Sequence, residues 1–76
     1  MNLTGLSLIS VVMPVYNIMH IKHKFVMAVN SIINQTWQNW ELIIINDGSI
    51  DATESIVNRF VSKDRRIILV NKDNGG

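Results

Sequence analysis

The chain contains no cysteine. Disulfide bonds and zinc sites built from cysteine are therefore excluded. The absence is compatible with a reducing compartment, and we expect a cytoplasmic protein, either free or at the inner face of the membrane. At 76 residues with 47% hydrophobic content, the chain can form one small domain at most.

Neither sign of charge dominates, because seven Lys+Arg residues stand against six Asp+Glu residues, for a net charge of +1. A nucleic-acid-binding surface needs clustered basic residues. The one basic group is Lys63, Arg65 and Arg66, and Asp64 interrupts it. This pattern favours a solvated turn between a helix and a strand, and we expect no nucleic-acid partner.

No apolar run approaches the roughly 18 residues that a membrane-spanning helix needs. The first nineteen residues carry no charged side chain, but polar residues interrupt them and no basic segment begins them. A buried strand explains the run 8–15 better than a signal or an anchor. We therefore expect residues 1–7 to form an N-terminal extension and residues 8–76 to form the folded part.

Several specific motifs are also absent. No G-x-G-x-x-G follows the first apolar run, no phosphate-binding P-loop sequence occurs, and no D-x-D pair is present. His20 and His23 lie three residues apart without further ligands at suitable spacing, so they are interpreted as ordinary surface residues. The sequence therefore predicts no metal site within this chain.

Short apolar runs alternate with helical patterns, which is typical of βαβ units with a parallel sheet. The predicted strands are 8–13, 40–45 and 67–70; Pro14 is expected to end the first, and 15–22 is expected to be a loop. A helix is predicted over 23–34. A second helix is predicted after a turn at 46–49, with Asp51 as its cap and Glu54 completing a capping box.

The predicted fold is therefore an α/β protein with the order β-α-β-α-β. Because crossovers between parallel strands are right-handed, both helices should cover one face of the sheet. The expected strand order is 3-2-1, which is half of a Rossmann-like doubly wound sheet. The other face would lack cover, so we expect an incomplete domain that a missing C-terminal half or a protein partner completes.

Ligands of open α/β sheets bind beyond the carboxyl ends of the strands. The segments 14–17, 46–49 and 71–76 should meet there. Asp47 could accept hydrogen bonds from a ligand or could only shape the turn, and spacing alone leaves both readings open. Tyr16 could stack on a flat ring, although packing against a helix is favoured by the sequence alone. Ser49 and Asp51 are interpreted as residues at the start of a helix rather than as catalytic groups.

Three ordered segments, 10–17, 31–37 and 40–51, resemble family 2 glycosyltransferases of the GT-A fold, and Asn74-Gly75-Gly76 is similar to the start of the family's next motif. The resemblance implies a nucleoside-diphosphate-sugar donor, most often a UDP-sugar. It places Tyr16 beside the base, Pro14 along the same pocket, and Asp47 on a ring N–H of the base. Asn17 and Gly48 belong to the same two motifs and complete the predicted nucleotide-sugar-binding set.

The chain departs from the family pattern at Ile50, where threonine is usual, and at Asn46, where many members have aspartate. The family's D-x-D motif, catalytic base and acceptor-binding segment would follow residue 76. The resemblance therefore implies a divalent cation, Mg²⁺ or Mn²⁺, and a glycan or lipid-linked acceptor for the full-length enzyme. It implies no catalytic residue in this chain, which should be inactive alone.

The sequence thus predicts the N-terminal fragment of a glycosyltransferase of polysaccharide or glycoconjugate synthesis. An inactive remnant that binds nucleotides or docks on a partner is the alternative. An unrelated half-Rossmann domain is a third hypothesis, and the missing glycine fingerprint argues against it.

Overall fold

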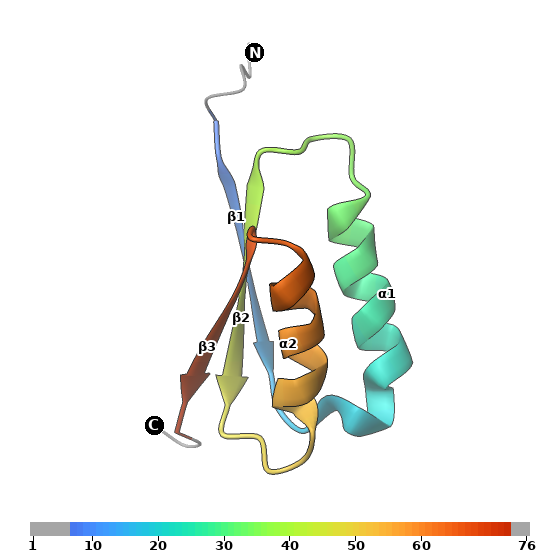
Figure 1. The fold of residues 1–76 in the computed structure, drawn as a ribbon, viewed down its shortest axis with the longest axis vertical. Coiled ribbons are helices and arrows are strands. Elements are labelled where there is room, and N and C mark those ends of the chain that lie inside the picture. Colours follow the sequence, from blue (N-terminus) through green and yellow to red (C-terminus); the bar gives the residue numbers. More distant parts are fainter. Residues whose placement is uncertain (1–6, 74–76) are drawn as a thin grey trace.

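The computed structural model describes residues 7–73. Most of the predicted N-terminal extension and the segment Asn74–Gly76 lie outside the described residues. The elements in chain order are β1 (Ile9–Val15), the short 3₁₀ helix η1 (Ile18–Ile21), α1 (Lys22–Ile33), β2 (Trp40–Asp47), α2 (Thr53–Lys63) and β3 (Ile67–Lys72). The three strands form one parallel sheet in the order β1-β2-β3, which confirms the predicted order. Both helices lie on the same side of this sheet (Figure 1).

The core lies between the helices and the central strand β2. Leu42 and Ile44 of β2 are fully buried, whereas the alternating residues Ile43 and Ile45 are only partly covered. This alternation follows from the two-residue period of a strand. The helices contribute a buried apolar stripe whose members are Phe25, Val29, Ile56 and Val57. The Phe25 and Phe60 rings join the two helices edge to face, with centroids 5.9 Å apart.

The opposite face of the sheet is open among residues 7–73. Val12 of β1 is 57% exposed, and Ile68 and Val70 of β3 are 41% and 43% exposed. These side chains alternate with residues that point toward the helices, so the exposed positions share one face. We call this surface the open face.

Pro14 does not end the first strand, contrary to the prediction. β1 continues through Pro14 to Val15, and Pro14 pairs in register with Ile45. The N–H of Ile9 donates to the carbonyl of Asn39 at 3.0 Å, so the odd-numbered residues of β1 direct their backbone groups toward β2. The nitrogen of Pro14 therefore faces the other edge, where a missing donor removes no ladder bond.

The other boundaries also differ from those predicted. β2 extends through Asn46 and Asp47, so the turn starts two residues later than expected. β3 likewise extends to Lys72, and η1 forms where a loop was expected. β2 and β3 continue beyond their apolar runs because Asn46 pairs with Asn71 and Asp47 with Lys72 in the parallel ladder.

The predicted capping box is wrong. The residue that precedes α2 is Ala52, which makes no side-chain capping bond. The carboxylate of Glu54 instead accepts a hydrogen bond from the Asn71 side chain at 3.1 Å. Tertiary pairing with β3 has replaced the local bond that the sequence pattern indicated.

The amino-terminal end of the sheet, away from the predicted site, is closed by a side-chain cluster. The Arg66 guanidinium lies 3.8 Å from the centre of the buried Trp40 ring and forms an ion pair with Asp64 at 2.8 Å. This pairing lowers the pKa of the Asp64 carboxyl and raises that of Arg66. Trp40 is thus a core anchor, with 1% of its surface exposed. Neither helix within residues 7–73 is long and apolar enough to cross a membrane.

Candidate functional site

The carboxyl ends of all three strands meet at one rim of the sheet. The register pairs Val15 with Asn46, Asn46 with Asn71, and Asp47 with Lys72. The segments that follow β1, β2 and β3 therefore start side by side, as the parallel topology requires. This rim is where ligands of open α/β sheets bind.

Asp47 is the last residue of β2 and lies on the open face, because its neighbour Asn46 points toward the helices. Its side chain is 39% exposed, but the Oδ1 atom is covered and has no hydrogen-bond partner within residues 7–73. Lys72 Nζ lies 3.8 Å from this oxygen, which is an ion pair but too long for a hydrogen bond. Asp47 therefore keeps acceptor capacity at the rim.

Pro14 and Tyr16 come from the neighbouring strand end. Pro14 is exposed on the open face and pairs in register with Ile45, two residues before Asp47. Tyr16 follows the end of β1 and is 48% exposed, so half of its surface is free of protein contact. The structure thus brings the ends of their strands together with that of Asp47.

Asn17 has a left-handed backbone, with φ of 46°. Asparagine tolerates this conformation better than most residues. Its Oδ1 accepts a hydrogen bond from the N–H of Ile50 at 2.9 Å, and its own N–H donates to Ser49 Oγ at 2.9 Å. Asn17 therefore joins the loop after β1 to the loop after β2.

Two further bonds continue this connection. The N–H of Ile18 donates to Thr53 Oγ1 at 2.9 Å, and the N–H of Met19 donates to Asp51 Oδ2 at 3.2 Å. Three successive backbone donors of residues 17–19 are thus bound by Ser49, Thr53 and Asp51. We call these bonds the inter-loop network.

Thr53 is the centre of the inter-loop network, since it is completely buried and its hydroxyl also donates to Asp51. This side-chain bond is the main cause that lowers the pKa of the Asp51 carboxyl, and backbone bonds from Thr53 and Met19 act in the same direction. Asp51 was predicted to cap α2. It does accept the N–H of Thr53, but it also holds the first loop.

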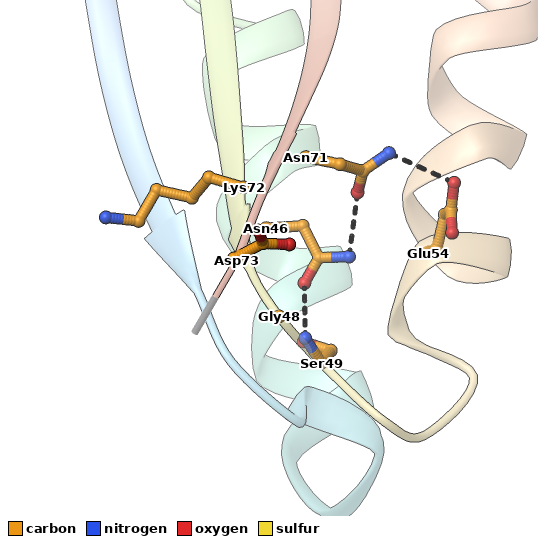
Figure 2. Close-up of a pocket in the computed structure, with 7 residues that line it drawn as sticks. All are labelled: Asn46, Gly48, Ser49, Glu54, Asn71, Lys72 and Asp73. Atoms are coloured by element: carbon orange, nitrogen blue, oxygen red, sulfur yellow. Dashed lines mark hydrogen bonds between the residues drawn. The ribbon is translucent and has the colours of Figure 1, made fainter. Parts of the chain in front are cut away.

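A cavity of about 320 Å³ lies at the same rim. The residues that line it are Asn46, Gly48, Ser49, Glu54, Asn71, Lys72 and Asp73. Asn46 is 4% exposed, donates to Asn71 Oδ1 at 3.0 Å and accepts from the Ser49 N–H at 3.3 Å. Gly48 has φ of 68°, which suits glycine at this turn. Figure 2 shows the Asn46, Asn71 and Glu54 side chains bonded to one another and Lys72 extending away from them.

Sequence reasoning placed segment 71–76 at this rim but singled out neither Asn71 nor Lys72 within it, and it missed Thr53 altogether. Asn71 and Lys72 follow the apolar run of β3, and the continued two-residue alternation could have placed Lys72 on the face of Asp47. Thr53 has no sequence signal that separates it from an ordinary residue in the first turn of a helix.

Within residues 7–73, no three His, Asp or Glu side chains gather closely enough to hold a metal ion. His20 and His23 are both exposed.

Comparison with known proteins gives a consistent family. The sequence model of Glycosyl transferase family 2 matches residues 10–76. The glycosyltransferase GlyA of Streptococcus pneumoniae is 40% identical over 90% of this chain and 9% of its own length. An uncharacterized glycosyltransferase of Haemophilus influenzae is 42% identical over 86% of the chain and 25% of its own length. The glycosyltransferase GlyG of S. pneumoniae is 39% identical over 91% of the chain and 22% of its own length. The chain thus spans a quarter or less of the length of these relatives.

Proposed function

The chain belongs to glycosyl transferase family 2, and from this premise we propose that its rim binds the nucleotide of a nucleoside-diphosphate-sugar donor, specifically a UDP-sugar. Glycosyl transfer by a longer enzyme that contains this chain is the part of the proposal that rests on family membership. The donor class and a role in polysaccharide or glycoconjugate synthesis are our proposal. In it, Asp47 accepts a ring N–H of the base, and Tyr16 and Pro14 bound the pocket around that base.

One observation supports this proposal most directly. The Asp47 Oδ1 atom is covered yet receives no hydrogen bond within residues 7–73, although it lies at the rim where such sheets bind ligands. A covered polar atom without a partner is uncommon in native structures, because desolvation costs free energy that a hydrogen bond normally offsets. A base N–H would supply the missing donor once the carboxylate, whose side chain is 39% exposed, turns this oxygen toward the ligand.

Asn17 and Gly48 are proposed to act through the backbone. The left-handed conformation of Asn17 and its bonds to Ser49 and Ile50 fix the loop that carries Tyr16. Gly48 lets the chain turn directly after Asp47 without a Cβ atom that could crowd the ligand.

Transfer of the sugar also needs a group that removes the proton of the acceptor, and a cation commonly offsets the charge of the leaving diphosphate. No step of the reaction is assigned to residues 7–73, among which no three His, Asp or Glu side chains gather closely enough to hold a metal ion. We propose that Mg²⁺ or Mn²⁺, the base and the glycan or lipid-linked acceptor are bound by further residues of a longer enzyme, in the cytoplasm or at the inner membrane face. Residues 1–76 alone would then transfer no sugar.

The same longer enzyme is the proposed cover of the open face. Relatives that are at least four times longer than the matched segment have the chain length to supply it. Burying side chains such as Val12, Ile68 and Val70 would remove exposed apolar area from water.

Calorimetric titration with UDP tests the nucleotide proposal. Wild-type chain should bind UDP, and Asp47→Ala should weaken binding by about 10- to 100-fold, the usual effect of losing a hydrogen bond to a charged group. Glu41→Ala is the matched control, because it removes one carboxylate near the amino-terminal end of the same strand, away from the rim. Absence of UDP binding by wild-type chain with a folded circular dichroism spectrum would contradict the proposal, as would equal effects of the two variants.

The exposed open face also favours a second candidate, an inactive nucleotide-binding remnant whose sheet is covered by a separate protein. The DNA that follows codon 76 discriminates between the two. An open frame that encodes a D-x-D motif within a few tens of codons would support the enzyme, whereas a stop codon with retained expression would support the remnant.

A further inference from the structure

Lys72 is the basic residue among those that line the rim cavity, and the proposed function gives it no role. It is the last residue of β3 and pairs in register with Asp47. Its side chain is 47% exposed and lies on the open face, whereas the neighbouring Asn71 is bonded to Asn46 and Glu54 on the helix side. Figure 2 shows Lys72 separate from that amide group.

The contact between Lys72 and Asp47 is loose. The Nζ–Oδ1 distance is 3.8 Å, so the two charges attract each other without sharing a hydrogen bond. Partly exposed ion pairs of this kind contribute little to folding. An ammonium group has three donors and a carboxylate accepts only, so both partners keep hydrogen-bonding capacity toward a ligand.

We infer that Lys72 and Asp47 together read the base of the nucleotide, with Asp47 accepting a ring N–H and Lys72 donating to the adjacent ring carbonyl. This inference rests on the proposed function, since it takes the base to lie at Asp47. Lys72 is then a residue that sets specificity by contact with the ligand.

A carboxylate acceptor beside an ammonium donor favours a base that presents an N–H next to a carbonyl oxygen. Uracil presents an N–H at position 3 between two carbonyl oxygens, which complements a carboxylate beside an ammonium group. Cytosine presents an unprotonated ring nitrogen at the same position and an amino group in place of one carbonyl. Its lone pair would face the carboxylate and its amino group would face the ammonium, so both contacts become unfavourable. A site that hydrogen-bonds one base edge discriminates against a base whose edge leaves its polar groups unpaired.

The matched ligands UDP and CDP isolate this effect, because they share the ribose and the diphosphate and differ only in the base. Wild-type chain should bind UDP more tightly than CDP in calorimetric titrations. Lys72→Met should reduce the UDP-over-CDP preference by roughly tenfold, the effect of one charge-assisted hydrogen bond. Lys72→Arg, which keeps the charge and the donors, should retain most of the preference.

Lys63→Met is the control variant. It removes the same charge from the last turn of α2, which ends at the opposite side of the sheet from the rim (Figure 1). This variant should leave the UDP-over-CDP preference unchanged. Urea titration and circular dichroism should show that Lys72→Met is folded, as expected for a half-exposed lysine.

The outcomes separate the two proposals. Absence of UDP binding by folded wild-type chain would reject the nucleotide function and this inference with it. If UDP binds and Lys72→Met leaves the UDP-over-CDP preference intact, Lys72 is only a cross-strand partner of Asp47 and the inference is overturned alone. Equal weakening of both nucleotides would also overturn it, because the ammonium would then act on the shared phosphates.

Discussion

Replacement of Thr53 by valine should loosen the loop that carries Tyr16 without changing the shape of the core. Thr53 is completely buried, and its Oγ1 accepts the N–H of Ile18 at 2.9 Å in a buried environment. Valine has nearly the same shape but leaves that N–H without a partner. The expected loss of unfolding free energy is about 1–3 kcal/mol, the cost of a buried unsatisfied polar group.

Serine at the same position is the informative comparison. Thr53→Ser keeps the hydroxyl that bonds to Ile18 and Asp51, and removes only one methyl group. Loss of one buried methyl group costs about 1 kcal/mol. Thr36→Val in the exposed turn after α1 makes the same chemical change where no core is involved, and should stay within about 0.5 kcal/mol of wild type.

Urea denaturation followed by circular dichroism measures the stability change, and amide hydrogen exchange at Ile18 tests its cause. Thr53→Val should accelerate exchange at Ile18, whereas Thr53→Ser should keep this amide protected. The reasoning would be refuted if Thr53→Val were as stable as wild type, or if both Thr53 variants changed Ile18 exchange equally.

Three further predictions concern stability. The pKa of the Asp51 carboxyl is lowered in the folded chain, so its contribution to stability is complete above its ordinary pKa near 3.8. That contribution is lost as the pH falls through the lower folded value. Asp51→Asn should therefore reduce stability at neutral pH and flatten the acid unfolding curve in this window. Arg66→Ala should lower the urea midpoint and shift tryptophan emission to longer wavelength, because Trp40 loses its covering guanidinium, whereas Arg65→Ala at an exposed neighbour should do neither. Leu42→Ala on the helix side of β2 should cost about 2–5 kcal/mol, and Val12→Ala on the open face should cost far less in the same urea titrations.

The order and direction of the strands could be predicted because they depend on patterns that the sequence carries explicitly. Three β-branched runs separated by amphipathic segments leave few topologies that keep right-handed crossovers. The residues at which the helices and strands begin and end were harder to predict from the sequence. β1 continues through Pro14 because the proline nitrogen faces an edge that has no pairing strand within residues 7–73. Glu54 accepts a hydrogen bond from Asn71 instead of forming the expected cap of α2. Both outcomes depend on tertiary neighbours that local pattern does not encode.

The site was predictable to the extent that it follows from topology. Parallel strands place their carboxyl ends together, so the meeting of the strand ends that carry Pro14, Asp47 and Lys72 needs only the strand order. The inter-loop network was not predictable in the same way. The role of Thr53 depends on the backbone of Ile18 arriving within hydrogen-bond distance, which requires the folded path of both loops.

Asn46 and Asp47 are adjacent in β2, but their side chains lie on opposite faces of the sheet and are assigned different roles. Successive side chains point to opposite faces, so Asn46 meets the helix side, where Asn71 and Ser49 satisfy its amide. Asp47 points to the open face, where Oδ1 has no donor within residues 7–73. An asparagine can exchange hydrogen bonds with other amides, whereas a carboxylate only accepts and needs a donor from outside. If the two residues were exchanged, a buried carboxylate would replace the amide that bonds to Asn71 and Ser49, and the rim would lose its negative charge. The order asparagine-aspartate is therefore the arrangement that allows both faces to form.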